Sequence, residues 1–349
     1  MTLPLALTMG EPAGIGGEIA LQAWLRRRDG VPPFYLIDDP GRLAGLACRL
    51  GWSVPVRTLA SPQEAPAVFA DSLPVLPVGG TPRGEPGRPD PADALLVIGA
   101  IDAAVAAVRD GSATAVVTNP INKYVLYRAG FRHPGHTEYL SELAATGESA
   151  VMMLASPQLR VVPVTIHLAL RQAIEQLSGE AIIHAGRVTH RALVRDFAIA
   201  APVLVFAGLN PHAGEAGSLG REDIEIIGPA IAALQADGID ARGPRAADTM
   251  FHAEARRGYD AALCMYHDQA LIPIKALDFD GAVNVTLGLP FIRTSPDHGT
   301  AFDIAGRGIA RPDSLIAALK LAAAMAARRQ NSQSGGWARP KADRFSKSR

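Results

Sequence analysis

The chain has 349 residues, and its 34 Lys and Arg residues balance its 34 Asp and Glu residues. This length allows one large domain or two ordinary ones, and we expect two. The balanced charge provides no global basic field, so no nucleic-acid partner is expected and any anion must be recognised locally. The only cysteines, Cys48 and Cys264, lack a CxxC spacing and therefore support neither a disulfide framework nor a cysteine metal site.

The beginning of the chain predicts a strand, a glycine turn and a helix in succession. Residues 3–10 are apolar, residues 10–17 are rich in glycine, and residues 18–28 have helical periodicity. The glycines fit neither GxGxxG nor GxxxxGK[ST], so a tight turn and a ligand site are about equally supported and no Rossmann domain is indicated. MTLPLALTMG lacks the pattern of a signal peptide, and no apolar run is long enough to span a membrane. We therefore expect a soluble, cytoplasmic protein without a membrane partner.

Strands and helices alternate along the rest of the chain. Strands are predicted at residues 33–39, 114–123 (ending in a functional-looking loop), 151–156, 160–167, 203–209, 261–268 and 283–289. Helices are predicted at residues 94–111, 137–145, 170–197, 221–238 and 314–329. Residues 76–91 read as an exposed loop, and residues 330–349 as a polar, basic, disordered tail. The alternation predicts an α/β protein with covered sheets.

Three histidines each follow an apolar run: His167 in VVPVTIH, His212 in VLVFAGLNPH and His267 in AALCMYH. The carboxyl ends of strands line the ligand crevice of open α/β sheets, so the three imidazoles could converge there. Catalytic zinc commonly has three protein ligands and one open position, which suits this wide spacing. Taken singly, each histidine could instead be a hydrogen-bonded residue at a strand end.

Two further groups of polar residues indicate an anion site. His136 and Thr137 stand at the predicted start of a helix, where free backbone N–H groups favour an anion, although Thr137 alone could be an ordinary N-cap. Lys275, Asn284 and Arg293 lie in a segment rich in Pro and Gly. Together they could clamp a phosphate or carboxylate, although each cation alone could be a solvated surface side chain.

Two aspartates are candidates for a direct chemical role. Asp268 adjoins His267, so it could be a metal ligand, an outer partner of an imidazole or a proton acceptor. Asp248, in RAADTMF, could serve in catalysis or cap a helix.

The most distinctive stretch is TSPDHGTAFDIAGRGIARPDS. It resembles the HGSAPDIAGxGxANP loop of isocitrate and isopropylmalate dehydrogenases, which holds the adenosine part of a nicotinamide cofactor. The cofactor-binding residues that this resemblance implies are His298, Gly299, Thr300, Ala301 and Asp303.

Several blocks together resemble the 4-hydroxythreonine-4-phosphate dehydrogenases, the PdxA family of vitamin B6 synthesis. They are GEPAGIG, GHTEYL, VVPVTIHLALR, GLNPHAGE, ADTMF, MYHDQ and VNVTLGLPFIRTSPDHGTA, in order between about Leu5 and about Ala326. The implied fold is of the isocitrate/isopropylmalate dehydrogenase type, with two α/β domains flanking an active-site cleft. The implied first domain, residues 1–127 with 290–329, carries the cofactor loop. The second, residues 128–289, carries the metal ligands and the dimer interface.

The same resemblance implies the site and the reaction. His167, His212 and His267 would hold one divalent Zn, Mg or Co ion across a homodimer with shared active sites. His136, Thr137, Lys275, Asn284 and Arg293 would contact a small phosphorylated hydroxy acid. Asp248 and Asp268 stay the catalytic candidates that the residues themselves indicate. The implied reaction is oxidation of 4-phosphohydroxy-L-threonine at its 3-hydroxyl by NAD or NADP, followed by decarboxylation to 3-amino-2-oxopropyl phosphate.

Other functions stay open at this stage. Close paralogues oxidise 4-phospho-D-erythronate or D-threonate 4-phosphate. Phosphate acyltransferases resemble the same fold without hydride chemistry, a zinc phosphohydrolase could use a histidine-rich site, and a non-catalytic metabolite-binding protein is the remaining alternative. The histidine set and the predicted nicotinamide loop favour the dehydrogenase.

Overall fold

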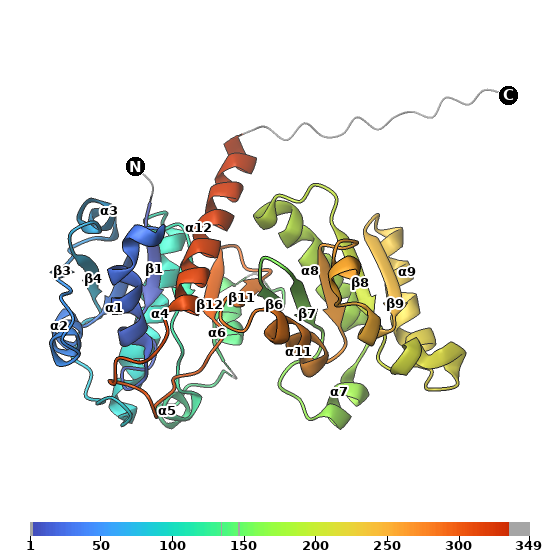
Figure 1. Ribbon diagram of the computed structural model, residues 1–349, viewed down its shortest axis with the longest axis horizontal. Coiled ribbons are helices and arrows are strands. Elements are labelled where there is room, and N and C mark those ends of the chain that lie inside the picture. Colours follow the sequence, from blue (N-terminus) through green and yellow to red (C-terminus); the bar gives the residue numbers. More distant parts are fainter. Residues whose placement is uncertain (1–2, 134, 146, 335–349) are drawn as a thin grey trace.

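The computed structural model describes residues 3–133, 135–145 and 147–334 as an α/β protein built on one 12-stranded sheet (Figure 1). The strands are β1 (Leu5–Thr8), β2 (Phe34–Asp38), β3 (Val56–Thr58), β4 (Leu73–Pro77), β5 (Val116–Thr118), β6 (Val151–Ala155), β7 (Arg160–Pro163), β8 (Val203–Ala207), β9 (Asp240–Arg245), β10 (Ala261–Cys264), β11 (Val283–Leu287) and β12 (Arg293–Pro296).

The helices cover both faces of this sheet. The α-helices are α1 (Gly16–Leu25), α2 (Pro40–Arg49), α3 (Ala65–Val68), α4 (Ala94–Arg109), α5 (Lys123–Arg128), α6 (His136–Ala144), α7 (Leu170–Gln176), α8 (Gly179–Phe197), α9 (Gly228–Ala236), α10 (Ala253–Arg256), α11 (His267–Leu277) and α12 (Asp313–Ser334). The short 3-10 and π segments are η1 (Arg27–Asp29), η2 (Pro62–Glu64), η3 (Pro91–Asp93), η4 (Pro211–Gly217), η5 (Asp223–Ile227) and η6 (Ala247–Thr249).

The sheet has two parallel parts joined by an antiparallel middle. Its order is β3-β4-β2-β1-β5-β12-β11-β6-β7-β10-β8-β9. The strands from β3 to β12 are parallel, and so are those from β7 to β9, whereas β11 and β6 run antiparallel to their neighbours. Parallel pairs need crossover connections that place helices on both faces. The predicted α/β class is therefore confirmed.

Alternating residues of the strands pack into separate cores on the two faces of the sheet. Leu5 and Leu7 of β1 join the cluster that contains buried side chains of α1, α8 and α12, whereas Ala6 joins the cluster beneath α4 and α6. A third cluster packs α11 against β7 and β10. Because side chains alternate between faces with a period of two, each short strand contributes to both layers.

The end of the chain returns to its beginning. β12 lies between β5 and β11, and α12 packs against β12, α8 and α1 (Figure 1). The helix predicted to end at residue 329 continues to Ser334, so the first residues of the predicted disordered tail are helical. Residues 335–349 of that tail lie outside the part that the structure describes.

Three predicted elements differ from the structure. The strand predicted at 160–167 ends at Pro163, and the one predicted at 261–268 ends at Cys264, so neither His167 nor His267 is in a strand. His267 instead begins α11, which the sequence did not predict because Pro273 interrupts its helical pattern. The helix predicted at 170–197 divides into α7 and α8, and the Ser178 hydroxyl caps the second of them.

One described segment, Pro91–Arg109, has the length and composition to cross a membrane. It includes α4, whose Val97, Ile101 and Ala104 are buried, and this helix packs against β1 and β2. Apolar core helices of this kind meet the same criteria without spanning a bilayer.

Candidate active site

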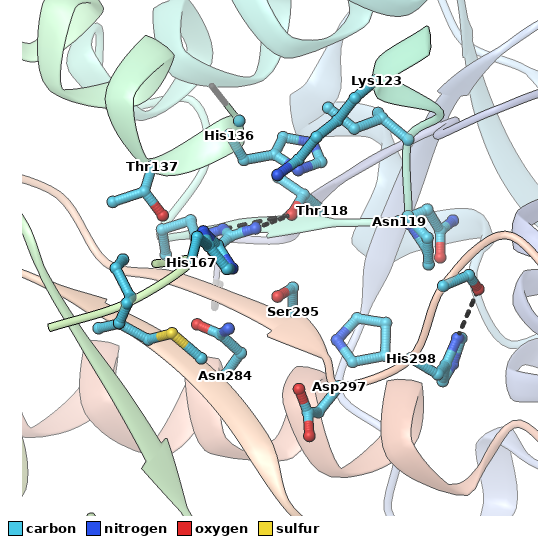
Figure 2. A pocket seen from close by; sticks show the side chains of 18 of the residues that line it. Thr118, Asn119, Lys123, His136, Thr137, His167, Asn284, Ser295, Asp297 and His298 are labelled. Carbon is cyan, nitrogen blue, oxygen red and sulfur yellow. Dashed lines mark hydrogen bonds between the residues drawn. The ribbon is translucent and has the colours of Figure 1, made fainter. Parts of the chain in front are cut away.

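A cavity of about 500 Å³ lies over the antiparallel middle of the sheet (Figure 2). Asn284 pairs with Ser295, and Thr286 pairs with Arg293, in the ladder between β11 and β12. Partners opposite each other share a face, so these alternate residues form one polar floor. The cavity is lined by Thr118, Asn119, Pro120, Ile121, Lys123, Gly135, His136, Thr137, Glu138, Met152, Ile166, His167, His267, Leu271, Lys275, Asn284, Arg293, Ser295, Pro296, Asp297, His298 and Gly299.

Arg293 is a buried cation without a carboxylate partner among the described residues. It is 4% exposed, and its guanidinium donates to the hydroxyls of Thr118 at 2.6 Å and Thr286 at 2.9 Å. Burial lowers its pKa to about 10, because a buried site solvates a positive charge poorly. A buried charge is unfavourable unless it is paired, so an anion bound in the cavity would supply the negative charge that the guanidinium needs.

His136 begins α6 beside this cation, as predicted. Its Nε2 is buried without a hydrogen-bond partner in the part of the chain that the structure describes, and burial, followed by the charges of Arg293 and Lys123, holds its pKa well below the usual range. This shift favours the neutral ring, which can donate one N–H to a bound oxygen. The prediction that Thr137 could be the N-cap is wrong, because Gly135 occupies that position without a side-chain cap; Thr137 still lines the cavity.

Lys275 and Asn284 also line the cavity, but Lys275 does not lie in an irregular segment as its sequence context predicted. It projects from α11 and forms an ion pair with Asp297 at 2.8 Å. Asn284 leaves its buried Oδ1 without a partner among the described groups. A buried acceptor of this kind normally has a donor, so Asn284 is available to a hydroxyl or an amino group.

The residues that the sequence analysis did not single out come mainly from the segment after β5. Thr118, Asn119 and Lys123 line the cavity, and Figure 2 shows Lys123 beside His136. Their signal was the polar TNPINK sequence, read as a functional-looking loop without individual assignments. Glu138, Ser295 and Asp297 also line the cavity. They stand in GHTEYL and TSPDHGTAFDIAGRGIARPDS, from which the sequence analysis singled out only neighbouring residues.

His167 and His267 lie together at one side of the cavity. Their ring centroids are 6.1 Å apart, a separation compatible with two imidazoles sharing one ion through metal–nitrogen bonds of about 2.1 Å. Burial, then the charges of Lys123 and His267, lowers the pKa of His167, which favours the neutral ring that a metal requires. His167 also has a φ of 54°, an uncommon conformation that a metal-binding role would explain. The two donors therefore fit a divalent metal.

His212 does not join this pair within one chain. No group of three His, Cys, Asp or Glu side chains suited to a metal occurs among the described residues, and His212 is absent from the cavity lining. It follows β8 in η4, where residues 212–216 all have positive φ. For a non-glycine residue the left-handed conformation costs about 1–2 kcal/mol, so this unusual backbone must be held by its surroundings.

The two candidate aspartates differ in position. The Oδ1 of Asp268 lies 2.7 Å from Nδ1 of His267, an arrangement that fixes the ring and leaves Nε2 for a ligand. Asp248 is exposed in η6, outside the cavity. Because η6 contacts η4, Asp248 and His212 occupy neighbouring segments.

The predicted cofactor loop extends from the cavity toward the beginning of the chain. His298 and Gly299 line the cavity, and the buried Nε2 of His298 has no described partner. The Thr300 carbonyl accepts from the N–H of Ile15, and Ala301 has a φ of 46°. Asp303 is exposed.

Glu18 of α1 fixes the far side of the same loop. It is buried and accepts backbone N–H groups from Gly306 at 2.9 Å and Ala310 at 3.2 Å. The N-terminal glycine segment therefore acts as a support for this loop, and the open space around Gly299 leaves room for a cofactor.

Comparisons with known proteins identify similar sequences and a similar fold. The family model described as "Pyridoxal phosphate biosynthetic protein PdxA" matches residues 32–322. A 4-hydroxythreonine-4-phosphate dehydrogenase of Methylorubrum populi is 58% identical, covering 94% of this chain and 96% of the relative. One from Bradyrhizobium diazoefficiens is 57% identical, covering 93% and 97%. The crystal structure of such an enzyme from Klebsiella pneumoniae has a TM-score of 0.84 and 36% identity, covering 93% of this chain and 100% of that one.

Proposed function

The chain belongs to the PdxA family, whose named relatives are oxidoreductases, and from this we propose that it is a 4-hydroxythreonine-4-phosphate dehydrogenase of vitamin B6 synthesis. In this proposal it oxidises the 3-hydroxyl of 4-phosphohydroxy-L-threonine with NAD or NADP. Decarboxylation then gives 3-amino-2-oxopropyl phosphate. The observation that carries the proposal is the buried guanidinium of Arg293, which has no carboxylate partner among the described residues, in a cavity that also holds two adjacent imidazoles.

We propose that the phosphate binds between Arg293 and the beginning of α6. The guanidinium donates N–H groups, His136 supplies its unpartnered Nε2, and Thr137 lies in the first turn of the helix. A helix N-terminus and a guanidinium both favour a phosphate dianion. Lys275 and Asn284 then face the remaining polar atoms of the substrate. Holding both ends of a small molecule fixes its reacting carbon, which can lower a barrier by several kcal/mol.

We propose that His167 and His267 hold one divalent ion, with His212 of a second copy as the third ligand. Imidazole donors suit zinc and cobalt better than magnesium. The ion would lower the pKa of the substrate hydroxyl and stabilise negative charge on oxygen. Asp268 would keep His267 in the tautomer that binds the ion.

Exposed apolar side chains near the histidine pair support a homodimer with shared active sites. Leu168 follows His167, and Ile272 follows His267 on α11; they are 37% and 66% exposed. The partly apolar hollow beside the pair is lined by Thr165, His167, Leu168, Leu170, Ala173, Tyr266, His267 and Asp268. Exposed apolar patches rimmed by polar groups mark contact surfaces. A second copy docked there would bring η4 and η6, with His212 and Asp248, to this hollow.

We propose that the nicotinamide cofactor lies along the loop that contains His298, Gly299, Thr300, Ala301 and Asp303. The cofactor would accept the hydride. Glu18 supports the far side of this loop, and His298 lines the cavity with a buried Nε2 that has no partner among the described groups. Asp248 or Asp268 would accept the hydroxyl proton. A cytoplasmic location is a further prediction, which cell fractionation would test.

The first test is metal-dependent reduction of NAD and NADP, followed at the reduced-nicotinamide absorption band. Three substrates should be compared: 4-phosphohydroxy-L-threonine, 4-phospho-D-erythronate and D-threonate 4-phosphate. We expect the first to react and chelation to stop it. Turnover of only the other two would move the enzyme to a sugar-acid pathway, and turnover of none would contradict the proposal.

Mixing two inactive variants tests the shared site. His167→Ala and His212→Ala should each abolish turnover, whereas His190→Ala on α8, outside the cavity, should not. Co-refolded His167→Ala and His212→Ala chains should recover about a quarter of the activity, because half of the dimers are hybrids with one intact site. No recovery, with hybrid dimers demonstrated, would place all three histidines in one chain and refute sharing.

A further inference from the structure

Three neighbouring parallel strands lead into the three histidine segments. β10 pairs with β7 on one side and with β8 on the other, and His167, His267 and His212 follow β7, β10 and β8 respectively. Backbone ladder bonds hold the strands themselves, but the histidines lie beyond the strand ends. Other contacts must therefore fix the positions of these segments relative to one another.

The backbone of Met265, just after β10, receives side chains from both directions. Its N–H donates to Oε1 of Gln269 at 2.7 Å, and its carbonyl accepts from the hydroxyl of Thr165 at 2.8 Å. Met265 is 1% exposed, Thr165 8% and Gln269 9%. Buried hydrogen bonds are shielded from water, and removing one partner destabilises the protein because the other is left as an unsatisfied buried polar group. Thr165 thereby ties the His167 segment to the beginning of the His267 segment.

The other end of Gln269 reaches the His212 segment. Its Nε2 donates to the carbonyl of Gly208 at 2.7 Å, immediately after β8. Gly208 admits no larger residue, since a Cβ there would lie 2.6 Å from Oδ1 of Asp223. Asp223 in turn accepts the N–H of Leu209 at 2.9 Å. The backbone that leads to His212 is thus held between Gln269 and Asp223.

We propose that Gln269 is a positioning residue for the metal sites of the proposed dimer: within one chain, its two buried amide contacts set His267, which serves one site, relative to the His212 segment, which serves the other. Gln269 lines neither the cavity nor the hollow beside the histidine pair. The inference rests on the proposed function, because it assumes that these histidines bind a metal. Loss of the amide contacts should therefore lower metal affinity, which loss of a comparable buried hydrogen bond elsewhere in the fold should not do.

Gln269→Met tests this, because it keeps a side chain of similar length and removes both hydrogen bonds. Thr294→Val is the matched control: the buried Thr294 hydroxyl donates to the Ala318 carbonyl at 2.9 Å, outside the cavity. The metal-free proteins would be titrated with Co²⁺ and Zn²⁺ against a chromophoric chelator, and the visible spectrum of the Co²⁺ form would report its coordination. Thermal unfolding of the same metal-free samples would measure the effect on the fold.

For Gln269→Met we expect metal affinity to fall about tenfold, the lower end of what loss of outer partners causes, together with a changed Co²⁺ spectrum. The Thr294→Val protein should lose thermal stability but bind metal as the parent does. Unchanged metal affinity in Gln269→Met, or an equal loss of metal affinity in Gln269→Met and Thr294→Val, would overturn the positioning role. If Gln269→Met does not fold, Thr165→Val removes one contact to Met265, and unchanged metal binding there would overturn the proposed cross-link.

The proposed function can fail separately in the same experiment. If the parent protein binds Co²⁺ no better than a His167→Ala variant does, the histidine metal site itself is wrong. If His167→Ala abolishes binding and Gln269→Met leaves it intact, only the positioning role of Gln269 is refuted.

Discussion

Replacing Arg293 with methionine should remove anion binding without destabilising the free protein. The fall in its pKa from 12.5 to about 10 through burial corresponds to roughly 3 to 4 kcal/mol of destabilisation of the charged form, at about 1.4 kcal/mol per pKa unit. Arg293→Met relieves this penalty but loses the charge-assisted hydrogen bonds to the hydroxyls of Thr118 and Thr286, worth about 1.5 kcal/mol for each hydroxyl. The two effects nearly cancel, so the free protein should be no less stable than the parent.

Thermal unfolding with and without inorganic phosphate would measure both consequences. Phosphate should raise the Tm of the parent protein, because a ligand that binds the folded state at about 100 times its Kd adds about 2.7 kcal/mol. The Arg293→Met protein should start at an equal or higher Tm and show no phosphate shift. Arg311→Met is the matched control, since Arg311 has a 67% exposed side chain paired with Asp280; its phosphate shift should remain.

Two outcomes would refute this reasoning. A large loss of stability in Arg293→Met without phosphate would mean that the guanidinium stabilises the empty fold. A retained phosphate shift would place the principal anion site elsewhere. The kcat/KM of the variant for the phosphorylated substrate should also fall, since it loses a charge-assisted contact.

Three further predictions concern other charged groups. Burial raises the pKa of Glu11 from 4.5 to about 7, so the contribution of this carboxyl group to stability declines as the pH rises through this interval. Glu11→Gln should therefore raise the Tm near pH 8 and not near pH 5. An equal change in Tm at both pH values would contradict this. Although burial opposes it, hydrogen bonds from Arg329 and Arg195 lower the pKa of Asp196. This stabilisation is present above the pKa of Asp196 in the unfolded state and is lost as the pH falls through its pKa in the folded state. Asp196→Asn should therefore lower the free energy of unfolding by about 3 kcal/mol near pH 7 and by much less in acid. Denaturant titrations at several pH values would measure this. Finally, chelating the metal should stop nicotinamide reduction and leave the phosphate-induced Tm shift intact; loss of both would mean that metal and phosphate sites are inseparable.

Local patterns in the sequence predict the parts of the site that depend on local structure. The apolar runs before His167, His212 and His267 correctly predict β7, β8 and β10, which are neighbours in the sheet, although β7 and β10 end before the predicted strands do. The start of α6 at His136 follows from the helical pattern after it. These features depend on hydrophobic periodicity and on strand ends, which can be recognised within about ten residues of sequence.

Long-range pairing could not be predicted in the same way. Nothing near Lys275 identifies Asp297 as its partner, and the interruption at Pro273 concealed the helix that carries Lys275. The separation of His212 from the other two histidines depends on a backbone with successive positive φ values, for which only Gly214 and Gly217 gave a local signal. Such conformations are fixed by surrounding contacts and not by propensity.

The position of β12 between β5 and β11 has a consequence for synthesis on the ribosome. Thr118 at the end of β5 and Arg293 at the start of β12 are bonded across a separation of 175 residues. At about 5–20 residues per second, a nascent chain exposes the edge of β5 for about 10 to 35 s before its neighbour emerges. Unpaired edges invite association with other chains. We therefore expect stalled chains that end before Arg293 to be cut by protease within residues 1–127, and full protection at that stage would show that this half folds without its last strand.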